Sequence, residues 1–212
     1  MSTVDLDVFL TKVLPYAPGC PEPTAFEHIR NAASDFCEET KLWRFEQTFT
    51  LGDTPNFCAT PVDAVIHDIE RCDFNGQRLD PTGVEWLDDR YPTWRSDSNL
   101  WTGQPRWFTQ TEPDTIRVVP APLETEKRVK VWLRLKPSED AETLPAFIHN
   151  QHAGLIAWGA LGSILMLPGQ TFSDPERAVY FQGKFDQALG RKSKLAATGQ
   201  QRAPIRVKGN FF

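Results

Sequence analysis

The chain has 212 residues, of which 40% are apolar, and it carries a net charge of −5. This apolar content is enough to bury the core of one large domain or two small ones, which excludes a largely disordered chain. The acidic balance of the chain disfavours general adhesion to nucleic acid.

Cysteine spacing and hydropathy indicate the compartment. The longest charge-free apolar run, Ala153 to Leu167, is shorter than the ~20 residues that cross a bilayer, so we expect no membrane contact. No secretory leader precedes the cysteines and no two of them form a C-x-x-C pair. This predicts synthesis in the cytoplasm and free thiols, without a disulfide or zinc framework, at Cys20, Cys37, Cys58 and Cys72.

The first 44 residues predict two helices. Apolar residues at three- and four-residue spacing predict a short amphipathic helix, which Pro15 ends: Leu6, Phe9, Leu10, Val13 and Leu14. After a Pro-rich loop, Thr24 and Glu27 form a T-x-x-E capping box, which predicts a second helix that ends near Trp43. Its apolar face comprises Phe26, Ile29, Ala33, Phe36 and Cys37.

From Phe45 to Lys136 the hydrophobic period changes to two, which predicts a small antiparallel sheet. Apolar residues alternate with polar ones from Phe45 to Leu51 and again from Val129 to Leu135. Asn75-Gly76 is typical of a type I′ turn and predicts a hairpin between a strand at Val65 to Cys72 and a short return strand. Ile116 to Val119 predicts a further strand.

An insertion from Thr82 to Thr111 interrupts this sheet. A short helix is expected near Val84 to Asp89, and the rest of the insertion is aperiodic and rich in tryptophan. It could be a stacking platform for a sugar or a base, or an interface with a neighbouring subunit or another protein. The absence of other ligand-site motifs favours the interface, with Trp94, Trp101 and Trp107 as its candidate residues.

The C-terminal third predicts two more helices. Thr143 is the expected N-cap of the first, with Pro145 in its first turn and an end near Leu167, before the break at Pro168-Gly169. Ser173 and Glu176 form an S-x-x-E box at the start of the second helix. The apolar face of this helix comprises Ala178, Phe181, Phe185, Ala188 and Leu189.

Helices placed before and after a sheet, instead of alternating with strands, predict an α+β fold. We expect the N-terminal helices (1–44) and the C-terminal helices (138–198) to form one helical bundle. Residues 45–137 are expected to form the antiparallel β domain with the insertion 82–111, and residues 199–212 an extended docking arm.

Small residues are concentrated in the first C-terminal helix. Each glycine in a helix costs about 1 kcal/mol relative to alanine, so a packing reason is expected for them. Two reasons remain open: a core helix within one chain, or a helix that also lines a contact between like subunits. The candidate ring-packing residues are Ala153, Ala157, Gly159 and Ala160.

The tail from Gly190 to Phe212 differs in charge from the rest of the chain. It carries six basic residues and no acidic residue, so the remainder of the chain has a net charge of −11. Apolar and polar residues alternate near its end, as in a strand that adds to a partner's sheet, although a disordered basic end remains an alternative. The candidate binding residues of the arm are Arg202, Ile205, Arg206, Val207, Lys208, Phe211 and Phe212.

No set of residues predicts catalysis, a metal or a cofactor. His149 and His152 share a helical face but lack further metal ligands, so they are expected as polar residues on a helix surface. Nucleophile-elbow, phosphate-loop and dinucleotide motifs are absent from the sequence. Adjacent carboxylates point in different directions and are expected in solvent: Glu38-Glu39, Asp88-Asp89 and Glu139-Asp140.

Several short motifs, taken in order, resemble the portal adaptor, or head-to-tail connector, proteins of tailed bacteriophages. The likeness runs from about Leu10 to Leu189, and the insertion from Thr82 to Thr111 matches the family least. The motifs are Leu-Pro-Tyr-Ala-Pro-Gly-Cys-Pro-Glu-Pro at 14 to 23, Phe-Cys-Glu-Glu-Thr-Lys-Leu-Trp at 36 to 43, Asn75-Gly76, Leu-Lys-Pro at 135 to 137, Gly159-Ala160, Met-Leu-Pro-Gly at 166 to 169 and Ser-Asp-Pro at 173 to 175.

The resemblance implies a structural protein at the head–tail junction of the virion. It implies a ring of twelve copies, a bundle that stacks under the portal protein, a sheet domain that meets the downstream tail or nozzle protein, and a C-terminal segment that reaches the portal. Double-stranded DNA would pass through the channel without sequence-specific binding. Two alternatives remain: a tail-associated peptidoglycan hydrolase that uses the Trp-rich loop as a glycan platform, and a nucleic-acid binder with a basic tail.

Overall fold

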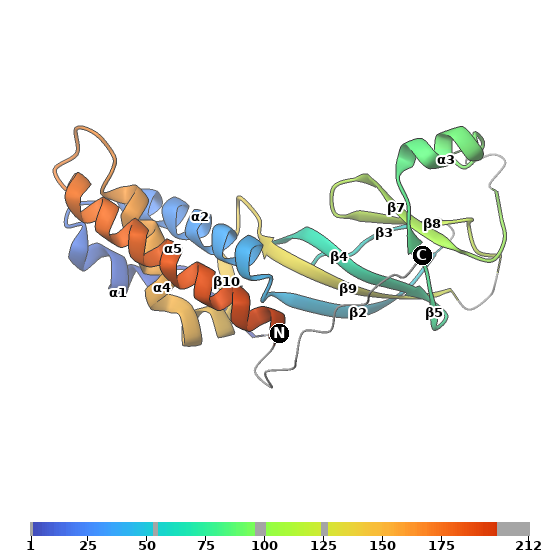
Figure 1. Ribbon diagram of the computed structural model, residues 1–212, viewed down its shortest axis with the longest axis horizontal. Helices are drawn as coiled ribbons and strands as arrows, with labels where there is room; N and C mark the ends of the chain where they lie inside the picture. The colour runs from blue at the N-terminus through green and yellow to red at the C-terminus, as the bar shows by residue number, and fades with distance from the viewer. Residues whose placement is uncertain (1, 53–54, 96–100, 124–126, 199–212) are drawn as a thin grey trace, which may run out of the picture. The chain divides into compact units, whose positions relative to one another are not determined.

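The structure is a computed structural model that describes residues 2–52, 55–95, 101–123 and 127–198 (Figure 1). The chain divides into two compact units. The helical unit comprises Met1–Trp43 and Lys136–Phe212, and the sheet unit comprises Arg44–Leu135. Both ends of the chain therefore contribute to the helical unit. The predicted α+β class is confirmed.

The described part of the helical unit contains four α-helices, a short 3-10 helix and a two-stranded sheet. These elements are β1 (Thr3–Asp5), α1 (Asp7–Val13), η1 (Leu14–Tyr16), α2 (Glu22–Thr40), β10 (Thr143–Pro145), α4 (Ala146–Ile164) and α5 (Pro175–Thr198). None of the helices in the described ranges combines the length and the apolar character that a membrane span requires.

The N-terminal helices follow the predicted periodicity, but α2 starts earlier than its predicted capping box. It begins at Glu22, directly after Pro21, and Pro23 stands in its first turn, where the missing N–H of proline costs nothing. Thr24 is therefore inside the helix and the predicted T-x-x-E cap is wrong. The helix ends at Thr40, where Lys41 takes a left-handed conformation with a φ of 53° and donates its N–H to the carbonyl of Cys37.

Both C-terminal helices begin later than their predicted caps. Thr143 is not an N-cap, because Thr143–Pro145 forms strand β10, which pairs antiparallel with β1 and places Leu144 opposite Val4. Helix α4 starts only at Ala146. For α5, the cap is Asp174 and not Ser173, since the Asp174 carboxylate accepts the backbone N–H of Arg177 at 3.1 Å.

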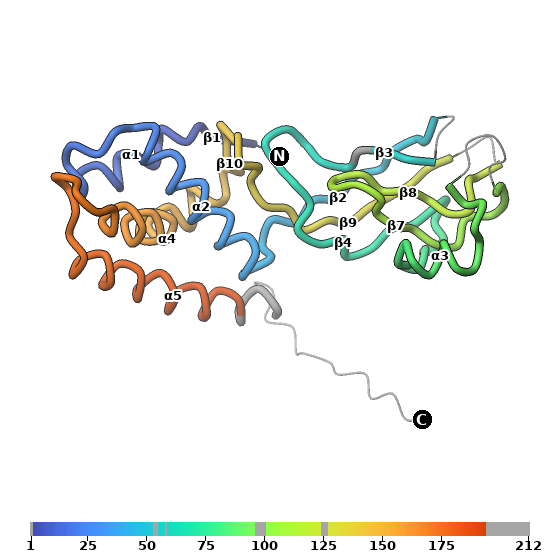
Figure 2. The backbone as a smooth tube through the Cα atoms, turned by 90° about the horizontal axis from the view of Figure 1, so that it is seen from above, coloured from blue at the N-terminus to red at the C-terminus, as the bar shows by residue number. Residues whose placement is uncertain are grey.

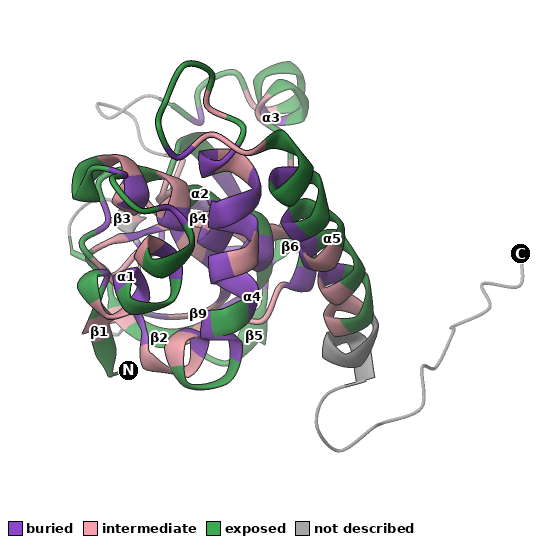
Figure 3. Cartoon of the chain, turned by 90° about the vertical axis from the view of Figure 1, so that its left-hand side faces the viewer, coloured by how far each residue is buried: buried purple, intermediate pink, exposed green. Residues whose placement is uncertain are grey.

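Helix α4 occupies the centre of the helical unit and packs against α1, α2 and α5 (Figure 2). Most of α4 is buried, whereas the outer face of α5 is exposed (Figure 3). The predicted apolar face of α5 is confirmed by the burial of Ala178, Phe181, Phe185 and Leu189.

The described part of the sheet unit contains two four-stranded sheets and one helix. Its elements are β2 (Arg44–Thr50), β3 (Asn56–Cys58), β4 (Ala64–Phe74), β5 (Gln77–Arg78), β6 (Asp80–Pro81), α3 (Val84–Arg90), β7 (Trp107–Glu112), β8 (Thr115–Val119) and β9 (Arg128–Pro137, which ends in the helical unit). The strand orders are β2-β9-β4-β5 and β3-β8-β7-β6.

The first sheet confirms the alternation read from the sequence. Strand β9 buries Val129, Val131, Leu133 and Leu135, with half-buried polar and aromatic residues between them. The predicted hairpin between β4 and β5 is also confirmed. Asn75 and Gly76 both have positive φ, 46° and 83°, as a type I′ turn requires.

The prediction of one small antiparallel sheet is wrong, because the insertion contributes to a second sheet. Strand β7, which begins at Trp107, pairs antiparallel with β8 and parallel with β6. A register shift between Thr109 and Glu112 interrupts its pairing with β8. Such an irregularity removes the strict period of two, which explains why this strand was not found in the sequence.

Candidate interaction site

The residues predicted to bind the portal lie in 199–212, outside the described residues. Their role therefore stays a prediction. The residues are Arg202, Ile205, Arg206, Val207, Lys208, Phe211 and Phe212.

The candidate ring-packing residues of α4 are buried within the chain itself. Ala153, Ala157 and Ala160 are at most 5% exposed, and Gly159 is also buried. A Cβ atom on Gly159 would lie 2.9 Å from the Cβ of Ala32 and 2.9 Å from the ring of Phe185. These residues set the spacing of α2, α4 and α5 within the chain. Their role in packing between subunits stays a prediction, and it would act through the outer faces of those helices.

Trp94, one of the three candidate interface tryptophans, lies in the interior of the sheet unit. It is 2% exposed and forms a core cluster with Leu87 and Val119. Its indole N–H donates to the Asp88 carboxylate at 2.8 Å, and the guanidinium of Arg117 lies 5.1 Å from the ring centroid. Trp94 thus stabilises the fold around the insertion and presents almost no surface to a partner.

The other two candidates, Trp101 and Trp107, belong to a cluster of half-buried aromatic rings at the surface. Tyr91 stacks on Trp101 with ring centroids 4.1 Å apart, and Trp107 lies 6.0 Å from Trp101. Trp86, which is 39% exposed, lies 5.4 Å from Trp107. We call Trp86, Tyr91, Trp101 and Trp107 the aromatic cluster.

Sequence reasoning did not select Trp86 and Tyr91 as candidates. The position of Trp86 on the predicted helix Val84 to Asp89 could have identified it as a surface residue. Neighbouring residues of a helix point to different faces, so Trp86 does not share the face of the buried Leu87. Exposed aromatic rings beside Arg90, whose guanidinium lies 5.7 Å from the Trp86 ring, have the composition of a protein interface.

The carboxylate of Asp88, on the same helix as Trp86, does not have the properties of a general acid. Both oxygens of Asp88 accept hydrogen bonds from Arg95, at 2.9 and 2.5 Å. These bonds, and then the bond from Trp94, lower the pKa of Asp88. A general acid in glycoside hydrolysis needs a raised pKa, whereas the pKa of Asp88 is lowered.

The prediction that His149 and His152 lie on a helix surface is wrong for His152. Its side chain is 6% exposed and its ring packs against Phe36 with centroids 4.8 Å apart. Burial, and then the charge of Lys192, lowers the pKa of His152 to about 4. His149 contacts Phe9 edge-on, and the described residues contain no group of three or more ligands that could hold a metal.

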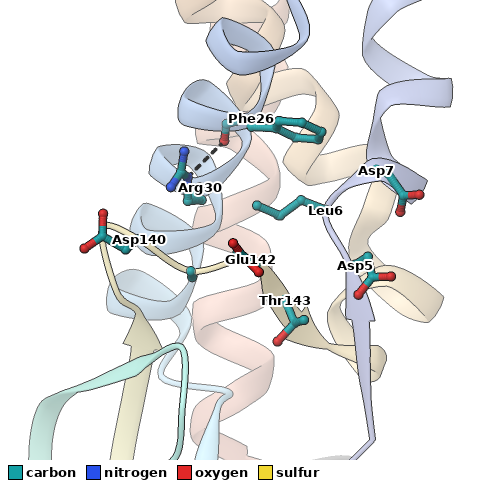
Figure 4. Close-up of a pocket in the computed structure, with 9 residues that line it drawn as sticks. Asp5, Leu6, Asp7, Phe26, Arg30, Asp140, Glu142 and Thr143 are labelled. Carbon is teal, nitrogen blue, oxygen red and sulfur yellow. Dashed lines mark hydrogen bonds between the residues drawn. The ribbon is translucent and has the colours of Figure 1, made fainter.

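An open groove of about 680 Å³ lies in the helical unit between β1, α2 and the residues that precede β10 (Figure 4). Arg30 donates to the carbonyls of Phe26 and Glu139, at 3.4 and 2.6 Å. The carboxylates in the lining outnumber this single guanidinium, so the groove is acidic. It offers open surface and no enclosed ligand site. Its acidic lining residues are Asp5, Asp7, Asp140 and Glu142.

A protein-family model described as SU10 adaptor protein matches residues 6–208 of the chain. The match covers nearly the whole sequence, and the chain belongs to this family, whose members are phage head–tail adaptors. Comparison with curated proteins finds no match. The family is structural, so the chain is not an enzyme, and the alternative of a peptidoglycan hydrolase is not supported.

Proposed function

We propose that this member of the SU10 adaptor protein family forms a ring of twelve copies that joins the capsid portal to the tail and continues the DNA channel. The family match over residues 6–208 carries the proposal. A phage adaptor associates with copies of itself and contacts portal and tail proteins at the head–tail junction. The ring, the number of copies and the DNA channel are the parts that we add.

The arm from Arg202 to Phe212 binds the portal in this proposal. Ordering a free segment costs about 1–2 kcal/mol per residue, so the arm must bury its apolar residues and pair its backbone with the portal to stay bound. The alternation of Ile205 and Val207 with basic residues supports such a strand. The basic charge of the arm then assists association without carrying the affinity alone.

The acidic body of the chain suits a channel wall. The chain without its tail has a net charge of −11, and a wall of this sign repels the DNA phosphates and prevents adhesion during passage. This argument predicts transport of DNA without sequence-specific binding.

The aromatic cluster provides the contact of the sheet unit with the tail component or with a neighbouring subunit. Three of its rings, Tyr91, Trp101 and Trp107, are half-buried and Trp86 is exposed, so a partner could cover them without unfolding the sheet. Large aromatic residues at the centre of an interface contribute most of the binding free energy in many complexes.

Electron microscopy of particles with and without this protein tests the ring directly. We expect an additional ring below the portal vertex, with twelve-fold symmetry in class averages. Particles that bind the protein as scattered single copies would contradict the proposal.

Truncation after Gln200 tests the arm. We expect the shortened chain to fold and to lose binding to purified portal. As a matched variant, replacement of Arg202, Arg206 and Lys208 by Gln removes the charge and keeps the apolar residues. This variant should still bind the portal at high salt, because its apolar residues remain. If the arm instead bound nucleic acid through its charges, its affinity would fall steeply as the salt concentration rises.

A further inference from the structure

Helix α5 presents two different exposed flanks on the helical unit. With about 100° of rotation per residue, Gly183 and Lys184 point to different sides of the helix. The two flanks differ in shape and in charge, and neither is covered by another described element.

The first flank borders an open groove of about 470 Å³ between α4 and α5. Two exposed apolar side chains stand at this groove, Met166 at 54% and Val179 at 63% exposure. We call Gly162, Met166, Val179, Gly183 and Asp186 the groove flank.

Glycine gives the groove flank an open centre. A Cβ atom on Gly162 would lie 3.2 Å from the Cα of Gln182, so that glycine is explained by the contact of α4 with α5. Gly183 stands inside α5, where glycine disfavours the helix, and a Cβ atom there would meet nothing within 4 Å. Packing within the chain gives no reason for Gly183 or for Gly154, and of these two glycines Gly183 lines the groove, where the close approach of another chain would give one.

The end of the groove flank is acidic. Asp186 stands at this end. Burial, and then the charges of Glu38, Glu39 and Asp186, raise the pKa of Asp35 on the neighbouring helix α2. Lys136 opposes this effect and pairs with Glu38. Four carboxylates around one ammonium leave a net negative charge beside the groove.

The second flank is basic and aromatic. Arg177, Lys184 and Arg191 recur every seven residues and share one side of α5. The ammonium of Lys184 lies 4.4 Å from the ring centroid of Tyr180, which is 56% exposed, and 5.2 Å from that of Trp158. Arg177 also lies 3.9 Å from Asp174. We call Arg177, Tyr180, Lys184 and Arg191 the basic flank.

We propose that the groove flank is the docking site for a second copy of this chain, which inserts its basic flank. Tyr180 would fill the apolar groove over Gly183, and the cations would face the acidic end at Asp186. Because the two surfaces differ, the contact is head-to-tail. A pair of chains keeps one free groove flank and one free basic flank, so further copies can add until the rotation between neighbours closes a ring. The inference rests on the proposed ring and names the surfaces that close it.

Two substitutions on neighbouring residues test the contact. Gly183→Leu fills the groove and Lys184→Glu reverses a charge of the basic flank. We expect each full-length variant to fold and to lose the ring that the wild type forms, alone or on purified portal. As matched controls, Gly154→Leu fills open space at an exposed glycine of α4 outside the groove, and Lys12→Glu reverses an exposed charge on α1; both should keep the ring.

Cross-linking separates a direct contact from an indirect effect on folding. We expect a mixture of Gly183→Cys and Lys184→Cys chains to form disulfide-linked pairs under mild oxidation, and a mixture of Gly154→Cys and Lys184→Cys chains to form none above the background of the single variants. If the wild type forms a ring but Gly183→Leu and Lys184→Glu also form it, or if the cross-link does not appear, this inference alone is overturned. A wild type that forms no ring, alone or on the portal, overturns the proposed function as well.

Discussion

The two units of the molecule are stabilised in different ways. In the helical unit, the central helix α4 approaches its neighbours closely because Gly159 and Gly162 carry no side chain. In the sheet unit, the solvent side of β9 carries Trp132 between two cations, with Arg71 at 4.8 Å and Lys130 at 4.7 Å from the ring centroid. The comparison teaches that the contacts of α4 with its neighbouring helices tolerate little added volume, whereas the solvent side of β9 tolerates changes of charge.

The largest effect is expected where the helices meet. Gly159→Leu should lower the free energy of unfolding by about 3 kcal/mol, because the added atoms overlap Ala32 and Phe185. Urea unfolding followed by circular dichroism measures this loss. Gly154→Leu in the same helix faces open space and should cause no loss. Equal effects of the two variants would contradict the close packing of α4.

The next largest effect is a pH dependence of the helical unit. The pKa of His152 falls from 6.5 to about 4 on folding, so the unfolded chain binds a proton first as the pH drops. Stability should be complete above pH 6.5 and should decline between pH 6.5 and about 4, by up to about 3 kcal/mol. Burial also lowers the pKa of His28, which adds to the decline.

Substitution of His152 isolates its part of this decline. His152→Leu should flatten the pH dependence measured by thermal unfolding between pH 7 and 4, whereas His149→Gln should leave the slope in place. A slope that is unchanged in His152→Leu would mean that His152 binds its proton as readily in the folded chain as in the unfolded chain.

A smaller effect is expected in the sheet unit, at the hairpin between β4 and β5. Gly76→Ala should cost about 1 kcal/mol, because Gly76 has a φ of 83° that alanine adopts only with strain. No atoms lie within 4 Å of the added Cβ, so the cost is one of backbone conformation alone. Gly52→Ala, at an exposed glycine of the same unit without positive φ, should leave the unfolding midpoint unchanged.

The smallest effect is expected on the solvent side of the same sheet. Glu46 accepts from Trp132 and pairs with Lys130, but the side chain of Glu46 is 53% exposed and that of Lys130 is 41% exposed. Glu46→Gln should leave the unfolding midpoint within experimental scatter, since solvent screens such pairs. Asp73→Asn should cost more, because the Asp73 carboxylate is 7% exposed and accepts two hydrogen bonds from Arg71. Equal losses would contradict this difference in burial.

Prediction from the sequence was most successful where a local pattern is compatible with only one local structure. The apolar face of α5 and the alternation along β9 follow from periodicity, and the turn at Asn75-Gly76 follows from the conformations that these two residues adopt readily. Helix starts were less predictable. A Ser or Thr of a capping-box pattern competes with its neighbours for the N-cap position. Pro21 occupies this position in α2 and Asp174 occupies it in α5.

For the candidate surfaces, the sequence identified the Trp-rich insertion but not its internal division. Trp94 lies in the core and Trp101 and Trp107 at the surface, and the difference arises from contacts with residues far along the chain, such as Val119. The same holds for His152, which Phe36 of another helix covers.

The sequence alone determined the α+β order of elements and the change of charge at the tail, because periodicity and composition are properties of neighbouring residues. Its short motifs, read in order, carried the resemblance to phage adaptors. Tertiary structure decided which side chains are buried, that Thr143–Pro145 pairs with Thr3–Asp5, and that α5 presents two unlike flanks. These features depend on segments that lie far apart in the chain, and only the folded backbone brings such segments together.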